Sequence, residues 1–529
     1  MRGLRRSLLA GLVALVGSSG SVVVSRVAAA EPLAERSGLR LVARGGEPVF
    51  ERRSGEWVWL ELGTLLVADG GPFEVRTRRT GYEQPIVADQ VVDGDAVRLP
   101  AGVVDAFTGF AGFTHVTVTD AAGRLVVERD ERFCPAGGPT VNPGRWAERV
   151  DADSPPSSPY PRGCPQHPFA WGAVWGLQDG WGVPSTNAWY SDQVSLADGT
   201  YTARVRVNQP FRDLFNIQAG RASVTLRFQV RTNTDPTAGT TSGDAGVAGH
   251  EHGHAAGAQP GGVSPATTDR RGRLWRPDLR PQPADAALTG AASAAGTDAG
   301  ADRGGREPRP DLRPLPAFDI ALDGSGAREL LTFSATVWNA GTSPLQVQGT
   351  RRPGRDVMDA VQHFSHPDGS PAGNTRVGTF EWDPRIGHEH WHFTDFVAYQ
   401  LRDAGGKVTA SQKQAFCVGN TGGVNTTLPA AVWRPVIGFD PVCGSADTQS
   451  LSQRLDVGWG DTYEQFLPGQ AIDVTDLPNG RYQLEVIVNP HRALHESDTD
   501  NNTVRRDIEI VGGRGQRSVL VPPHQGINA

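Results

Sequence analysis

Three histidines alternate with other residues in the stretch Gly387–Phe396, at His388, His390 and His392. Successive side chains of a strand point to opposite faces, so this spacing places all three imidazoles on one face of a strand. Imidazoles are ligands for copper and zinc, and three of them leave positions open for water or substrate, as in a catalytic metal site. A straight strand would separate the first and third Cα by about 13 Å, so we expect a bent or bulged strand here.

The alternative is an exposed histidine-rich strand that binds no metal. Trp391 and Phe393 favour a buried segment instead, and buried imidazoles need a partner such as a metal ion. The same alternation recurs at His250, His252 and His254, but glycine and alanine surround it there and no strand fixes the rings. At that second position we expect a solvated linker, with a metal-capturing tail as the other interpretation.

Residues 1–30 have the features of a secretory signal peptide. Arg2, Arg5 and Arg6 precede the apolar Leu8–Val16, which is too short to span a bilayer, and small residues suited to signal peptidase follow. A membrane anchor is the alternative. No later apolar run is long enough to cross a membrane, so we expect a secreted protein with no transmembrane segment after signal removal. The formal net charge of −7 argues against a nucleic-acid partner.

The chain contains two copies of one pattern of landmarks in the same order, which indicates an internal duplication. Both copies consist of short alternating runs separated by turn signals, which predicts strands. The paired landmarks are Thr77–Gly81 and Thr350–Gly354, Asp120–Arg124 and Asp403–Lys407, Phe133–Cys134 and Phe416–Cys417, Cys164 and Cys443, Gly180–Gly182 and Gly458–Gly460, and Leu196–Asn208 and Leu477–Asn489.

Each copy holds two cysteines in matching places, and an exported protein meets an oxidising compartment. We therefore predict the disulfides Cys134–Cys164 and Cys417–Cys443, with four free thiols as the alternative. Each cross-link would stabilise the fold by about 3 to 4 kcal/mol on the chain-entropy model.

These patterns predict an all-β protein with two tandem β-sandwich-like domains joined by a long disordered linker. The linker is rich in Gly, Ala and Pro and poor in aromatic and branched apolar residues, so it cannot bury a core. The expected boundaries are a signal peptide at 1–30, a first β domain at 38–231, the linker at 232–309, a second β domain at 310–512 and a tail at 513–529.

The second copy resembles the catalytic domain of the lysyl oxidase family over about Pro310 to Gly512. The resemblance rests on several motifs in one order, namely His388–His392, Lys413–Cys417, Asp461–Tyr463, Val488–Pro490, Glu496–Asp498 and Asn501–Asn502. It implies that His388, His390 and His392 hold copper, and that Lys413 and Tyr463 are joined into the cofactor lysyl tyrosylquinone.

The resemblance also implies an activity: oxidation of a primary amine, such as a lysine in a protein substrate, to an aldehyde. Dioxygen is the oxidant, and ammonia and hydrogen peroxide are released. Lys413 must be neutral to add to the tyrosine ring, so burial or a nearby cation has to lower its pKa. Asp395 and Asp461 are candidates for the general base. Family members carry several disulfides in this domain, whereas only Cys417 and Cys443 are present here.

The first copy lacks the chemical elements of the second. It has only His115 in the region that corresponds to the three histidines, Asp130 in the place of Lys413, and Ser185 in the place of Tyr463. We therefore expect a degenerate, non-catalytic lysyl-oxidase-like domain. An unrelated domain with similar sandwich features is the alternative.

Two other function classes stay open for the second copy. A histidine-ligated zinc hydrolase would need the three histidines but neither Lys413 nor Tyr463. A non-enzymatic copper-binding or adhesive β-sandwich protein would bind metal without releasing peroxide. Metal analysis combined with substitution of the lysine and the tyrosine separates all three classes.

Overall fold

In the computed structural model of the chain, the described residues are 38–52, 57–138, 146–186, 194–233, 308–324, 328–366, 370–385, 388–437, 443–513 and 515–527. The predicted signal peptide lies outside them, as does nearly all of the predicted linker with His250, His252 and His254. For Lys413 only the backbone is described.

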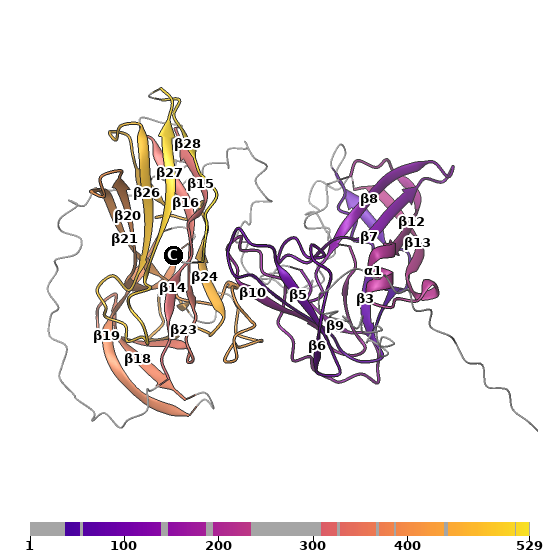
Figure 1. The fold of residues 1–529 in the computed structure, drawn as a ribbon, viewed down its shortest axis with the longest axis horizontal. Coiled ribbons are helices and arrows are strands. Elements are labelled where there is room, and N and C mark those ends of the chain that lie inside the picture. Colours follow the sequence, from indigo (N-terminus) through magenta and orange to yellow (C-terminus); the bar gives the residue numbers. More distant parts are fainter. Residues whose placement is uncertain are drawn as a thin grey trace, which may run out of the picture. The chain divides into compact units, whose positions relative to one another are not determined.

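In its described residues, the first half of the chain forms strands and one short helix, α1 (Figure 1). The strands form sheets in the orders β1-β3-β11-β9, β10-β4-β5-β6 and β2-β13-β12-β7-β8. The elements are β1 (Gly38–Ala43), β2 (Val49–Arg52), β3 (Thr64–Asp69), β4 (Phe73–Arg78), β5 (Val87–Val92), β6 (Asp95–Arg98), β7 (Phe110–Thr119), β8 (Leu125–Phe133), β9 (Glu148–Arg149), β10 (Gly172–Leu177), β11 (Trp181–Pro184), β12 (Gly199–Val207), α1 (Gln209–Leu214), a 3-10 turn (Ala219–Arg221) and β13 (Ser223–Thr232).

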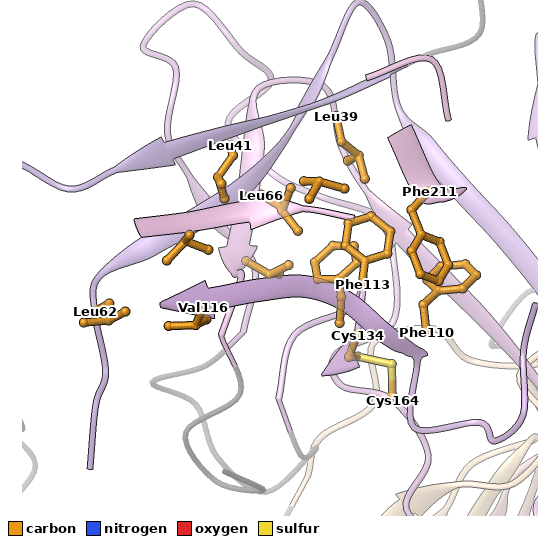
Figure 2. Packing of buried hydrophobic residues seen from close by; sticks show 14 of the residues in the cluster. Leu39, Leu41, Leu62, Leu66, Phe110, Phe113, Val116, Cys134, Cys164 and Phe211 are labelled. Atoms are coloured by element: carbon orange, nitrogen blue, oxygen red, sulfur yellow. A yellow bond between two sulfur atoms is a disulfide. The ribbon is translucent and has the colours of Figure 1, made fainter. Parts of the chain in front are cut away.

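Apolar side chains that alternate along these strands fill one core. Leu39 of β1 and Leu66 of β3 meet Phe113 of β7, and Phe211 of α1 packs on Phe113 with ring centroids 4.7 Å apart (Figure 2). The Cys134–Cys164 disulfide lies beside this cluster.

The second half forms two packed sheets, as expected for a sandwich. One has the order β14-β16-β24-β22, with β15 and β25 also paired to β16; the other has the order β23-β17-β18-β19-β20-β26-β27-β28, with β21 paired to β20. The strands are β14 (Leu312–Pro314), β15 (Phe318–Asp323), β16 (Leu330–Asn339), β17 (Leu345–Arg351), β18 (Val357–Ser365), β19 (Pro371–Asp383), β20 (His390–Asp403), β21 (Val408–Phe416), β22 (Gly422–Gly423), β23 (Ser450–Leu455), β24 (Trp459–Tyr463), β25 (Ala471–Asp473), β26 (Gly480–Val488), β27 (Thr503–Val511) and β28 (Ser518–Leu520).

Aromatic residues from both sheets meet in the core of the second half. Phe333 of β16 packs edge-on against Tyr399 of β20 with ring centroids 4.8 Å apart. Tyr463 of β24 stacks on Phe416 of β21 at 3.7 Å. The all-β fold in tandem domains is therefore confirmed. β20 and β21 pair in one sheet and β24 lies in the other, so the residues singled out for chemistry come from both sheets.

The strand orders of the two halves correspond. The order β13-β12-β7-β8 in the first half matches β27-β26-β20-β21 in the second, β10-β4-β5-β6 matches β23-β17-β18-β19, and β1-β3-β11 matches β14-β16-β24. Even the irregularities agree: the register shifts after the pair Phe110–Phe133 in one half and after Phe393–Phe416 in the other. We interpret the two halves as copies of one domain.

Both predicted disulfides are present. Cα atoms are 6.0 Å apart in Cys134–Cys164 and 5.7 Å apart in Cys417–Cys443, within the usual range for a disulfide.

Residues 513–529 are more than the tail we expected, because β28 pairs with β27 and extends the sheet. Buried Arg517, next to β28, forms an ion pair of 2.6 Å with Glu329. In the described part of the chain, no helix combines the length and the apolar character needed to cross a membrane.

Candidate metal and catalytic site

The three histidines come from a turn and the strand that follows it. His390 and His392 lie at the start of β20, where they pair with Asp383 and Glu381 of β19. His388 precedes the strand, in a turn closed by its backbone N–H and the carbonyl of Arg385 at 2.8 Å. The expectation that one strand face carries all three is therefore wrong. A turn brings the first imidazole back over the other two, which removes the separation of about 13 Å that a straight strand imposes.

The imidazoles converge closely enough to share one ion. Each can offer a nitrogen such that these atoms lie within 4.8 Å of one another. His388 and His392 are buried and His390 is partly exposed. Among the described residues, no hydrogen-bond partner reaches the buried Nε2 of His388. Burial, together with the nearby His390 and His388, lowers the pKa of His392, so this ring is neutral and able to bind a metal ion.

One carboxylate lies against the histidine cluster. Asp383, the last residue of β19, has Oδ2 at 3.2 Å from Nδ1 of His388 and at 3.5 Å from Nδ1 of His392. Arg385 donates to the same carboxylate from its backbone N–H at 3.0 Å and from Nε at 2.9 Å. Burial alone would raise the pKa of Asp383, but the hydrogen bonds from His388 and Arg385 hold it well below its usual range.

Tyr463 faces the histidines from the opposite sheet. Its ring centroid is 6.3 Å from that of His388 and 6.4 Å from that of His392. The hydroxyl accepts a hydrogen bond of 2.7 Å from the backbone N–H of Cys417, and the ring stacks on Phe416. Burial raises the pKa of Tyr463 well above its usual value, and nearby Asp461 raises it further. The phenol is therefore neutral and fixed in orientation.

Asp461 lies two residues before Tyr463 on β24 and is fully buried. Within the described residues, neither carboxylate oxygen has a hydrogen-bond partner. Burial raises the pKa of this carboxyl well above its usual value. Burial therefore favours the protonated form of Asp461 over the ionised form.

The structure gives Lys413 a backbone position on β21, opposite Ala398 of β20. Three residues further along β21, roughly 10 Å at about 3.3 Å per residue, Phe416 carries the ring that stacks on Tyr463. The lysine thus belongs to the strand that pairs with the histidine strand and that carries the ring stacked on Tyr463. Asp395 is different: it sits at the bulge of β20 with φ 52°, half exposed, and its carboxylate is 3.9 Å from Nε2 of His491.

Asp383 was missed in the sequence. It lies five residues before His388, too far for a strand alternation to connect the two. The sequence does show a carboxylate at the end of the strand that precedes the histidine motif. Only the pairing of β19 with β20 brings that carboxylate next to the histidines.

The first half lacks this arrangement at each corresponding place. Asp130 of β8 pairs with His115 as Lys413 pairs with Ala398. Ser185, in the place of Tyr463, has a short hydroxyl bond of 2.6 Å to Thr64. The first half therefore keeps the framework without the metal ligands or the phenol.

Three converging imidazoles beside a buried phenol define a candidate redox metal centre in a β-sandwich. The comparisons with known proteins agree with that class: residues 360–517 match the family model described as Lysyl oxidase. The second half of this chain therefore contains a lysyl oxidase family domain.

Individual relatives match over part of their length. The chain is 36% identical over 136 residues to Protein-lysine 6-oxidase of Gallus gallus, which covers 25% of this chain and 29% of that protein. It is 35% identical over 136 residues to the Homo sapiens protein of the same name, again 29% of that protein. Lysyl oxidase homolog 4 of Mus musculus is 28% identical over 191 residues, 36% of this chain and 20% of that protein.

Proposed function

We propose that this protein is a secreted copper-dependent amine oxidase of the protein-lysine 6-oxidase type. It converts primary amines, peptidyl lysine or similar, to aldehydes, uses dioxygen, and releases ammonia and hydrogen peroxide. The observation that carries the proposal is the approach of the Tyr463 ring to within 6.3 and 6.4 Å of two of the three converging imidazoles.

The donor set suits the metal. Three imidazoles are typical ligands for Cu(II), and the buried Nε2 of His388, which lacks a partner among the described residues, is an atom that a metal ion would satisfy. His388, His390 and His392 would hold the copper. With that metal and with lysyl tyrosylquinone made from Lys413 and Tyr463, the site would supply the two-electron oxidation of an amine by dioxygen.

The lysine content of the chain supports a chemical role for Lys413. Lys407 and Lys413 are the only lysines in the sequence, and the other basic residues of the Lys+Arg total of 51 are arginines. An ammonium group can lose its proton and become a nucleophile, whereas a guanidinium group stays charged. Lys407 lies in the exposed turn between β20 and β21, so Lys413 is the one lysine close in sequence to Phe416 and its contact with Tyr463.

The remaining residues of the site would exclude water and move protons. Phe416 covers one face of the Tyr463 ring, and Cys417 fixes its hydroxyl. Of the two candidate bases, Asp461 fits better than Asp395, because it is buried two residues from Tyr463 while Asp395 is half exposed at a bulge. A carboxyl whose pKa is raised toward the working pH is suited to accept and return a proton.

The test uses the full chain loaded with copper. We expect about one tightly bound copper, a visible absorption band that reacts with phenylhydrazine, and peroxide release from primary amines. Lys413→Ala and Tyr463→Phe should each abolish the band and the peroxide while copper stays bound. Lys407→Ala and Tyr482→Phe are matched controls, since the Tyr482 hydroxyl bonds to the Pro478 carbonyl and has no part in the site.

The competing functions give different results. A zinc hydrolase would hold zinc, and its activity would survive both the lysine and the tyrosine substitution. A copper-binding protein without catalysis would hold copper with neither the band nor the peroxide. Either result would end the oxidase proposal.

A further inference from the structure

We propose that Asp383 is the positioning residue of the three-histidine centre: its carboxylate holds His388 and His392 by their Nδ1 atoms and leaves both Nε2 atoms to bind the metal ion. The inference deepens the proposed function, because it rests on a metal ion occupying that centre.

The distances from Asp383 point to the same tautomer for both rings. A single oxygen, Oδ2 of Asp383, is 3.2 Å from Nδ1 of His388 and 3.5 Å from Nδ1 of His392. A carboxylate accepts hydrogen bonds, so each Nδ1 carries the proton, and a neutral imidazole then has its lone pair on Nε2.

A third contact agrees with this assignment. Nδ1 of His388 is also 3.3 Å from Nε2 of His392. With the proton on Nδ1 of His388, Nε2 of His392 is the acceptor in the metal-free protein, so a metal ion that binds this atom replaces the contact. The Nε2 atom of His388 is buried and has no hydrogen-bond partner among the described residues, so its lone pair is directed at space that a metal ion would fill.

Asp383 is itself held rigidly. It closes β19 opposite His390 in the strand register, so the ladder sets its backbone relative to the histidine strand. Its side chain accepts from the backbone N–H of Arg385 at 3.0 Å and from Nε of Arg385 at 2.9 Å. The arginine balances the charge of a carboxylate that is only 8% exposed. Arg385 also donates from Nε to Oδ2 at 2.9 Å, so the oxygen that faces the imidazoles is held by the arginine as well.

Such a carboxylate has a defined effect on a metal centre. It fixes the orientation and tautomer of the ligand ring and strengthens the nitrogen as a donor; its loss typically costs about 10- to 100-fold in metal affinity. The charge of Asp383 also compensates part of the charge of a divalent ion in a buried site.

The main test compares copper affinity in Asp383→Asn and in the wild-type full chain, by competition with a chelator of known affinity. The amide keeps the size of the side chain but removes its charge and its demand for the Nδ1 proton. We expect the Kd for Cu(II) to rise about 10- to 100-fold with the stoichiometry unchanged. The electron paramagnetic resonance spectrum of Cu(II) should change, a shift that a general loss of stability does not produce.

Asp359→Asn is the matched control. Asp359 lies on β18, next to β19, and pairs with Arg352 at 2.7 Å, away from the histidines. Its substitution should leave the Kd and the spectrum as they are. Should Asp383→Asn fail to fold, ¹⁵N NMR of histidine in the wild-type apo-protein tests the same idea, because His388 and His392 should both carry their proton on Nδ1.

Three outcomes would overturn the proposal. One is an Asp383→Asn protein with wild-type Kd and spectrum. Another is a wild-type Cu(II) spectrum that shows a carboxylate oxygen bound to the metal, which would make Asp383 a ligand. The third is a proton on Nε2 of His388 or His392 in the apo-protein. Copper bound with all these expectations met, but without amine oxidation, would end the proposed function and leave the role of Asp383 intact.

Discussion

Tyr463 is held by contacts of two kinds, and they separate its structural role from its chemical one. The ring stacks on Phe416, and the hydroxyl accepts from the backbone N–H of Cys417, which is buried. The ring alone fills the core beside His388 and His392, whereas the proposed oxidation to a quinone needs the hydroxyl in addition to the ring.

We therefore predict a divided result for Tyr463→Phe. Packing and copper binding should survive, because the ring remains. The free energy of unfolding should fall by about 1 to 3 kcal/mol, since the Cys417 N–H loses its acceptor in the interior. Peroxide release should vanish. Urea unfolding, metal analysis and a peroxide assay on one preparation test all three statements, and a variant that still oxidises amines would remove Tyr463 from the chemistry.

Asp461 gives a prediction about pH. Its pKa is raised by burial, so the folded protein retains a proton that the unfolded chain gives up above about pH 4. The stability that this group contributes is full below pH 4 and is lost as the pH rises toward the folded-state pKa. Asp461→Asn removes that loss.

We expect the metal-free Asp461→Asn protein to become more stable than wild type as the pH rises from 5 to 8, by up to about 1.4 kcal/mol per pH unit. Urea unfolding at several pH values measures the difference. Asp456→Asn provides a contrast. The Asp456 carboxylate lies 2.6 Å from Arg454, and the substitution removes this ion pair, so it should lower the free energy of unfolding. Parallel curves for wild type and Asp461→Asn would mean that Asp461 is ionised in the fold.

For single residues, the sequence predicts those that stand in a motif and misses those that come together only through strand pairing. The three histidines and Tyr463 stand in motifs of recognisable order, and the structure brings them together. The role of Asp383 depends on strand pairing and the raised pKa of Asp461 depends on burial, and no spacing along the chain encodes either.

At the scale of elements, β20 differs from the strand that the sequence predicted. It begins at His390 and does not include His388, and its bend lies after the histidine motif. The irregularity lies between Phe393 and Val397, where Asp395 adopts φ 52°. The corresponding position of the first half is Gly112, with φ 62°. Glycine adopts this conformation at no steric cost, whereas a residue with a side chain meets strain.

We predict that Asp395→Gly is neutral or stabilising, and that Asp395→Val lowers the free energy of unfolding by roughly 1 to 2 kcal/mol. Gly112→Val should destabilise its own half in the same way. Urea unfolding of the three variants tests the expectation. Retained oxidase activity in Asp395→Gly would also exclude Asp395 as the base, and equal stability of the glycine and valine variants would contradict the strain argument.

The two disulfides allow a matched comparison between elements of the two halves. They close loops with sequence separations of 30 and 26 residues. Removal of either pair, as Cys134→Ser with Cys164→Ser or as Cys417→Ser with Cys443→Ser, should therefore destabilise its half by about 3.5 kcal/mol on the chain-entropy model.

Their effects on the site should differ, because the backbone N–H of Cys417 holds the Tyr463 hydroxyl and the first pair has no such contact. We predict lower oxidase activity and a weaker quinone band only when Cys417 and Cys443 are replaced. Calorimetry and the peroxide assay provide the two readouts. Equal loss of activity in both double variants would mean that the disulfides act through general stability alone.

At the scale of the whole molecule, the order of the landmarks predicted the repeated topology, since strands that correspond in sequence also correspond in their pairing. The sequence did not predict which strands share a sheet, because pairing partners such as β3 and β11 lie far apart in the chain. It also missed β28, whose three residues Ser518–Leu520 carry no clear alternation and gain strand structure from the edge of β27.

The two halves lead to a prediction about metal content. His115, the counterpart of Ala398 in the strand register, lies between Glu128 and Asp130, at 3.3 Å and 2.8 Å, and has no second imidazole beside it among the described residues of the first half. We therefore expect one tightly bound copper per chain, lost in His390→Ala with His392→Ala and kept in His115→Ala. A variant with alanine at 250, 252 and 254 should also keep it, because the three converging imidazoles are those of His388, His390 and His392. Atomic absorption after dialysis against a weak chelator provides the count. A chain that still holds copper after the substitutions in β20 would place the tight site elsewhere and would separate metal binding from the strand that faces Tyr463.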